Sequence, residues 1–141
     1  MRPKKVILCV DDNEQELSVL TFMLNTNGYR VISASTGQEA IREFSQNQVD
    51  LVLADFHLQP VNGDQLAHRL KGIAAHVPML LLGDAPAGAE IHAADALLAK
   101  KNCSPHDLLE KIKLMSARKR GPRKGTQRVA TAATAELAAA S

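Results

Sequence analysis

Four charged residues follow apolar segments of the chain and could do chemistry together. They are the acids Asp11, Asp12 and Asp55 and the base Lys100. If the apolar segments are parallel strands, their carboxyl ends meet at one edge of a sheet, where ligands of such sheets bind. Three carboxylates at one place repel each other, and a hard cation such as Mg²⁺, which prefers oxygen ligands, relieves that repulsion. An aspartate beside such a cation can act as a nucleophile toward phosphorus, while a lysine ammonium neutralises the phosphoryl oxygens.

A simpler reading of the first two acids is that Asp11 and Asp12 only open a helix, where the helix dipole favours negative charge. That reading explains neither Asp55 nor Lys100. Four charged residues at matching strand ends therefore favour the phosphoryl-transfer interpretation.

The elements that must position these residues follow from the apolar pattern. Short apolar runs, typical of strands buried on both faces, alternate with segments of helical spacing. The strands are expected at 5–10, 30–34, 49–54, 78–82 and 96–99. Two helices are expected from apolar spacing, one around Leu17, Leu20 and Leu24 and one around Leu66, Leu70 and Ile73. A third is expected to begin after Thr36, which can act as its cap because Glu39 follows three residues later. The last is expected to begin at Ser104-Pro105 and to run through Met115. Residues 83–94 give a weaker pattern, so any helix there is short.

This alternation predicts an α/β fold with a five-stranded parallel sheet in a doubly wound arrangement. The length of 141 residues suits one domain, expected at 1–117, with a tail at 118–141. The tail holds six basic residues against Glu136 and is otherwise rich in alanine, so the remainder of the chain is acidic. We expect the tail to be disordered.

The cysteines Cys9 and Cys103 are too few for a disulfide framework and are expected to be reduced. The apolar stretch near the N-terminus is too short for a signal peptide or a membrane span. The expected location is therefore the cytoplasm, without membrane insertion. The motif GxxxxGK is absent, so nucleotide hydrolysis has no support.

The chain resembles response-regulator receiver domains over about 4–116. The resemblance rests on Val10-Asp11-Asp12, on the strand that ends in Asp55, on Gly63 eight residues later, and on Leu98-Ala99-Lys100. It implies the flavodoxin-like, CheY-like receiver fold. It also implies that Asp55 is the phosphoacceptor, that Asp11, Asp12, Asp55 and the backbone carbonyl of His57 hold Mg²⁺, and that Lys100 contacts the phosphoryl group.

The chain departs from the family pattern at the residues that, in receivers, convert phosphorylation into a conformational change. Gly83 stands where receivers place a threonine or serine hydroxyl, and Asp84 stands where a small residue usually follows. Leu97 replaces the aromatic switch residue, and Lys101 replaces a common proline. The segment between Gly83 and Lys100 is also shorter than is typical. Phosphorylation is therefore expected to be slower, with a weak conformational response, and Asp84 could face either the pocket or solvent.

The leading interpretation is a single-domain receiver in a two-component phosphorelay, not a turnover enzyme. It takes a phosphoryl group from a histidine kinase or a phosphotransfer protein and signals by protein contact. The alternative is a phosphorylation-independent pseudo-receiver that serves as an interaction module. A third possibility is weak binding of nucleic acid or another anionic partner through the basic tail. A haloacid-dehalogenase-like phosphatase is disfavoured, because His57 occupies the position of that family's second aspartate.

Overall fold

The five strands form one parallel sheet in the order β2-β1-β3-β4-β5. The computed structural model describes residues 4–84 and 91–117. The strands are β1 (Val6–Val10), β2 (Arg30–Ala34), β3 (Leu51–Asp55), β4 (Met79–Leu82) and β5 (Ala96–Leu98). The helices are α1 (Glu14–Thr26), α2 (Gly37–Gln46), α3 (Gly63–Ile73) and α4 (Pro105–Ser116), with a 3₁₀ turn η1 (Lys100–Asn102) before the last one. The predicted α/β architecture is confirmed.

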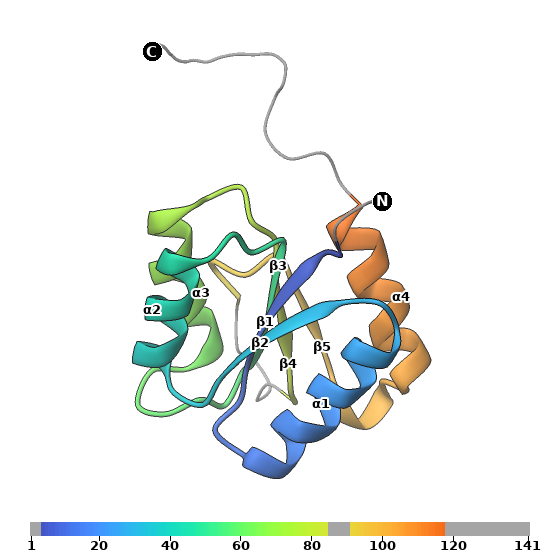
Figure 1. Cartoon of the computed structure of the whole chain (residues 1–141). Helices are drawn as coiled ribbons and strands as arrows, with labels where there is room; N and C mark the ends of the chain where they lie inside the picture. The colour runs from blue at the N-terminus through green and yellow to red at the C-terminus, as the bar shows by residue number, and fades with distance from the viewer. Residues whose placement is uncertain (1–3, 85–90, 118–141) are drawn as a thin grey trace.

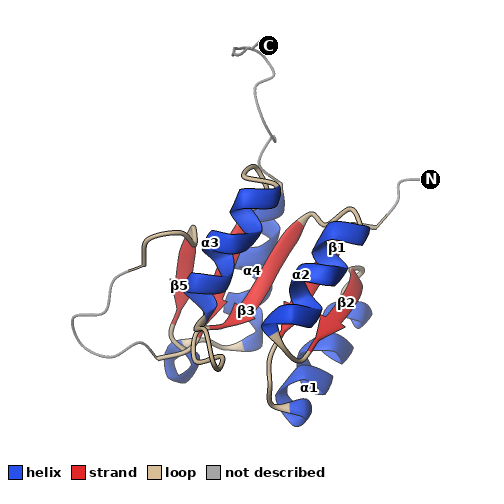
Figure 2. Cartoon of the chain, turned by 90° about the vertical axis from the view of Figure 1, so that its left-hand side faces the viewer, coloured by secondary structure: helices blue, strands red, loops and turns tan. Residues whose placement is uncertain are grey.

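The helices cover both faces of the sheet, with α2 and α3 on one face and α1 and α4 on the other (Figures 1 and 2). Each face has its own apolar core because alternate strand residues point to opposite sides. Leu8, Val10 and Leu81 pack toward α2 and α3, whereas Leu53 and Leu80 pack toward α1 and α4. The central strands are buried along nearly their whole length, which explains why they read as continuous apolar runs.

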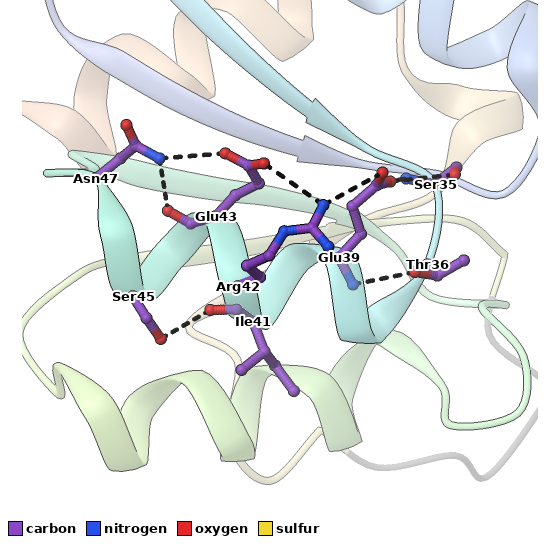
Figure 3. Close-up of polar contacts among 8 residues, drawn as sticks. All are labelled: Ser35, Thr36, Glu39, Ile41, Arg42, Glu43, Ser45 and Asn47. Carbon is purple, nitrogen blue, oxygen red and sulfur yellow. Dashed lines mark hydrogen bonds and ion pairs between the residues drawn. The ribbon is translucent and has the colours of Figure 1, made fainter.

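The predicted Thr36 cap starts α2, although the reciprocal contact differs from a standard capping box. The Thr36 hydroxyl accepts a hydrogen bond from the Glu39 backbone N–H at 3.0 Å. The Glu39 carboxylate accepts from the backbone N–H of Ser35 at 2.6 Å, one residue before the cap (Figure 3). Arg42 lies between Glu39 and Glu43 and contacts both carboxylates at 3.8 Å. The Thr36 hydroxyl and the Glu39 carboxylate thus each accept a hydrogen bond from a backbone N–H at the start of this helix.

The predicted start of the last helix is confirmed, with Ser104 as cap and Pro105 in the first turn. Other expectations need correction. Ile73 was placed on the apolar face of α3 but is 50% exposed, because it is the last residue of that helix. The short helix considered for 83–94 falls partly on residues 85–90, outside the described residues, and the described residues of that segment form no helix. The expected tail, 118–141, also lies outside them.

Candidate functional site

The three predicted carboxylates come together at the carboxyl edge of the sheet. Asp11 and Asp12 directly follow β1, and Asp55 is the last residue of the neighbouring strand β3. One oxygen from each of the three side chains lies within 4.8 Å of the other two. Asp11 is buried, Asp55 is partly buried and Asp12 is exposed, so the cluster runs from the interior out to solvent. A donor set of clustered carboxylate oxygens that is open to water could hold a hard divalent cation.

The buried member of this cluster carries an electrostatic cost. The side chain of Asp11 is 1% exposed. Desolvation, followed by the charges of Asp55 and Glu16, raises the Asp11 pKa to about 6, although the Asn13 backbone N–H and Lys100 oppose the shift. The Asn13 N–H donates to Asp11 Oδ1 at 2.9 Å. Positive charge beside Asp11, from a proton or a cation, would lower this cost.

Close backbone packing positions Asp55. The Phe56 N–H donates to Leu82 O at 3.0 Å, and the Gly63 N–H donates to Phe56 O at 2.9 Å. A Cβ atom at Gly63 would lie only 2.6 Å from the Asp55 carbonyl oxygen. Glycine is therefore the residue that lets the start of α3 approach the strand of Asp55 this closely. This contact explains the spacing of Gly63 from Asp55 in the sequence.

Lys100 lies at the same edge but pairs with a residue that was not predicted from the sequence. Its ammonium forms an ion pair and hydrogen bond with Glu16 of α1. Desolvation works against the charged form of Lys100, yet Glu16, Asp55 and Asp11 together raise the Lys100 pKa. Among the described residues, Glu16 is the one acid within ion-pair distance of Lys100. Lys100 and Asp55 therefore share the same edge of the sheet without forming an ion pair in this state of the protein.

The residues after β4, whose side chains depart from the family pattern, include a glycine with an unusual backbone conformation. Gly83 has a φ of +149°, a conformation that L side chains rarely adopt. A Cβ there would lie 3.3 Å from Asp55 Oδ1 and 3.4 Å from His57 Cδ2. Asp84 is exposed and does not belong to the group of three close carboxylates. Its backbone oxygen lies 2.8 Å from His57 Nε2, so the imidazole bridges the loops after β3 and β4.

A second residue that was not predicted from the sequence holds the segment leading into β5. Asp64, in the first turn of α3, is 7% exposed. Its carboxylate accepts three backbone hydrogen bonds, from His92 and Ala94 at 2.8 Å and from Ala93 at 3.0 Å. Burial disfavours the ionised carboxyl, but the three N–H donors outweigh burial and lower the Asp64 pKa. Asp64 thus anchors this segment to the helix that begins beside Asp55.

Comparisons with known proteins agree with this geometry. A family model described as the response regulator receiver domain matches residues 7–113. Among curated proteins, the alkaline phosphatase synthesis transcriptional regulatory protein PhoP of Bacillus subtilis is 31% identical over 120 residues. That match covers 81% of this chain and 49% of PhoP, so the chain spans about half the length of this relative.

Solved structures show the same architecture. A CheY-like receiver domain protein from Methanospirillum hungatei has a TM-score of 0.75 at 28% identity, covering 81% of this chain and 94% of that one. The response regulator TrrA of Thermotoga maritima, solved in complex with Mg²⁺ and BeF, has a TM-score of 0.71 at 27% identity. That match covers 79% of this chain and 98% of TrrA. With its parallel sheet, its clustered carboxylates and a family match over most of its length, this chain belongs to the response regulator receiver domain family.

Proposed function

We propose that this receiver accepts a phosphoryl group on Asp55 from the phosphohistidine of a histidine kinase or a phosphotransfer protein. The observation that carries the proposal is the cluster of Asp55 with the buried Asp11 and the exposed Asp12. The three carboxylates, together with the backbone carbonyl of His57, would hold Mg²⁺. The presence of Mg²⁺ in the related TrrA structure supports this choice of cation.

The chemistry assigned to each residue follows from its place in the cluster. A carboxylate oxygen of Asp55 attacks phosphorus, the P–N bond of the phosphohistidine breaks, and the departing imidazole nitrogen keeps the electron pair. Bound Mg²⁺ would supply charge neutralisation at the phosphoryl oxygens. Lys100 would neutralise another phosphoryl oxygen once its ammonium leaves Glu16. Asp11 and Asp12 would act as ligands of that cation and would take no part in bond making.

The signal is proposed to pass onward by protein contact in a phosphorelay. Cys9 and Cys103 are free thiols, which supports the reducing cytoplasm as the location. No helix in ranges 4–84 and 91–117 has the length and apolar character needed to cross a bilayer. We also propose that residues 1–117 form the receiver domain and that residues 118–141 are a separate segment.

One observation favours the pseudo-receiver as a second candidate. Gly83 offers no hydroxyl to a phosphoryl oxygen, and its positive φ sets the backbone after β4 in a conformation suited to glycine. A chain of this kind could keep the acid cluster and bind partners without modification. The two candidates differ in whether Asp55 becomes phosphorylated.

The deciding experiment is intact-mass spectrometry after incubation with acetyl phosphate. The wild-type protein with Mg²⁺ should gain one phosphoryl group, whereas Asp55→Asn with Mg²⁺ and the wild type with EDTA should gain none. Asp84→Asn serves as the matched control, because it removes a nearby carboxylate that is outside the cluster, and it should still be modified. If neither acetyl phosphate nor a phosphorylated histidine kinase modifies the wild type, the pseudo-receiver becomes the better description.

A further inference from the structure

The ion pair between Glu16 and Lys100 lies at the edge of the sheet that carries the proposed reaction site, close enough for the charges of Asp55 and Asp11 to act on Lys100. Glu16 belongs to the first turn of α1, whose cap is the Asn13 side chain. Lys100 opens the 3₁₀ turn after β5. The two residues are far apart in the sequence, so the docking of α1 on the sheet brings them together. Lys100 has no ion pair with Asp55 as long as Glu16 holds its ammonium.

The pair is held loosely enough to exchange partners. The side chains of Lys100 and Glu16 are 34% and 45% exposed, so water screens their attraction. They also line an open groove of about 380 Å³ between α1 and the end of β4, together with Gln15, Val19, Leu20 and Leu82. The lysine can therefore leave Glu16 without disturbing the buried core. A phosphoryl group on Asp55 would carry more negative charge than one carboxylate and would attract the same ammonium.

We propose that Glu16 binds the Lys100 ammonium in the unphosphorylated protein, and that Lys100 leaves Glu16 to pair with the phosphoryl group when Asp55 is phosphorylated. Glu16 is thus a positioning residue that competes with the transition state for Lys100. This inference rests on the proposed phosphorylation of Asp55. It assigns a role to an acid that lies outside the motif residues on which the family resemblance rests.

Glu16 should also affect Mg²⁺ binding, and this second effect favours phosphorylation where the first opposes it. Its charge acts on Asp11, so it adds to the negative potential at the carboxylate cluster. Removing that charge should weaken Mg²⁺ binding while it frees Lys100 for the phosphoryl group. The two effects separate when the phosphorylation rate is measured as a function of Mg²⁺ concentration.

The test compares Glu16→Gln with Glu14→Gln, using acetyl phosphate as donor. Glu14 is an exposed acid in the same helical turn, so its substitution makes the same change in net charge and helix dipole. For Glu16→Gln we expect a rate at saturating Mg²⁺ about two- to fivefold above wild type, as one partly exposed ion pair allows. The Mg²⁺ concentration that gives half of that rate should also rise. Glu14→Gln should change neither value. A saturating rate for Glu16→Gln equal to or below that of wild type would overturn the proposal, as would an equal effect in both variants.

A second measurement tests the pair without any phosphorylation. An amine-reactive acetylating ester is added to the metal-free protein, and peptide mass spectrometry compares acetylation of Lys100 with that of its exposed neighbour Lys101. The Lys100 to Lys101 ratio should rise about two- to fivefold in Glu16→Gln and stay constant in Glu14→Gln. An unchanged ratio in Glu16→Gln shows that Glu16 does not hold Lys100. If the ratio rises but the wild type takes up no phosphoryl group, the proposed function is what fails, and the exchange fails with it.

Discussion

Replacing Asp11 by asparagine should stabilise the metal-free protein while it removes the response to Mg²⁺. The ordinary carboxyl pKa of 3.8 rises to about 6 in the fold, mainly because Asp11 is desolvated. Each pKa unit corresponds to about 1.4 kcal/mol, so keeping Asp11 ionised at pH 7.5 costs up to about 3 kcal/mol. Water that reaches the exposed Asp12 screens part of this, and we expect a gain of about 1–2 kcal/mol in the variant. The amide oxygen introduced by Asp11→Asn could still accept the Asn13 N–H.

The sign of the pH dependence follows from proton linkage. The folded state binds the Asp11 proton more tightly than the unfolded state does, so this group lowers the free energy of unfolding as the pH rises. The loss should begin near pH 3.8 and be complete above about pH 6. The difference in stability between Asp11→Asn and wild type should therefore be small at pH 4 and reach its full size at pH 7. The other carboxyl groups titrate in both proteins, so their contributions cancel in the difference between the two free energies of unfolding.

Urea unfolding followed by far-ultraviolet circular dichroism, at pH 4 to 8 with EDTA or with Mg²⁺, measures both effects. Mg²⁺ at a hundred times its Kd should add about 2.7 kcal/mol to the wild type and nothing comparable to Asp11→Asn. Asp12→Asn is the matched control: it should weaken Mg²⁺ binding but leave the metal-free stability nearly unchanged, because Asp12 is exposed. A variant Asp11→Asn that is less stable than wild type in EDTA at pH 7.5 would refute the reasoning.

Three further substitutions test how the site is held, each by urea unfolding. Asp64→Asn should cost about 1–3 kcal/mol at pH 7, because it disrupts a carboxylate that accepts three backbone hydrogen bonds. Since the fold lowers the Asp64 pKa, the stabilisation by its ionised carboxylate is fully present above the ordinary pKa of 3.8 and is lost as the pH falls through the lower folded pKa. A destabilisation by Asp64→Asn that persists at low pH would contradict this. Gly63→Ala should cost at least about 2 kcal/mol and weaken Mg²⁺ binding, because its Cβ would lie 2.6 Å from the Asp55 carbonyl oxygen. Gly83→Ala should cost about 1–3 kcal/mol through its φ of +149°. Gly72→Ala, with open space around its Cβ, should be neutral or slightly stabilising, and a similar loss there would undermine both glycine predictions.

The strands and the carboxylate cluster could be predicted from the sequence because local rules determine them. Buried parallel strands are apolar along their length, so residues such as Leu8 and Leu53 marked them without reference to the rest of the chain. Parallel strands end at one edge of their sheet, which is why the positions of Asp11 and Asp55 at strand ends were enough to place them together. Helix starts were also predictable, since the Thr36 and Ser104 caps act within four residues.

The contacts of Glu16 and Asp64 could not be predicted, because both depend on how helices dock on the sheet. Glu16 lies in a first turn where acids are common, and nothing in its spacing distinguishes it from Glu14. Asp64 is likewise an ordinary first-turn acid until the segment at His92 folds over it. The positive φ of Gly83 was equally hidden, since glycine also occurs in extended backbone. In the structure Asp84 is exposed and stands outside the group of three close carboxylates.

These findings change what restoring the missing hydroxyl would test. Threonine at position 83 would add the hydroxyl of the family pattern, but its Cβ would also strain the backbone and approach Asp55 Oδ1 and His57. A slow or unstable Gly83→Thr variant therefore says little about the hydroxyl unless Gly83→Ala is measured beside it. Because glycine has no side chain, any coupling from Asp55 to the residues after β4 has to use other groups, and the His57 imidazole already contacts the Asp84 backbone oxygen. The ability of Asp55 to accept a phosphoryl group and the way the protein reports that event are thus separate properties of this chain, and each needs its own variant.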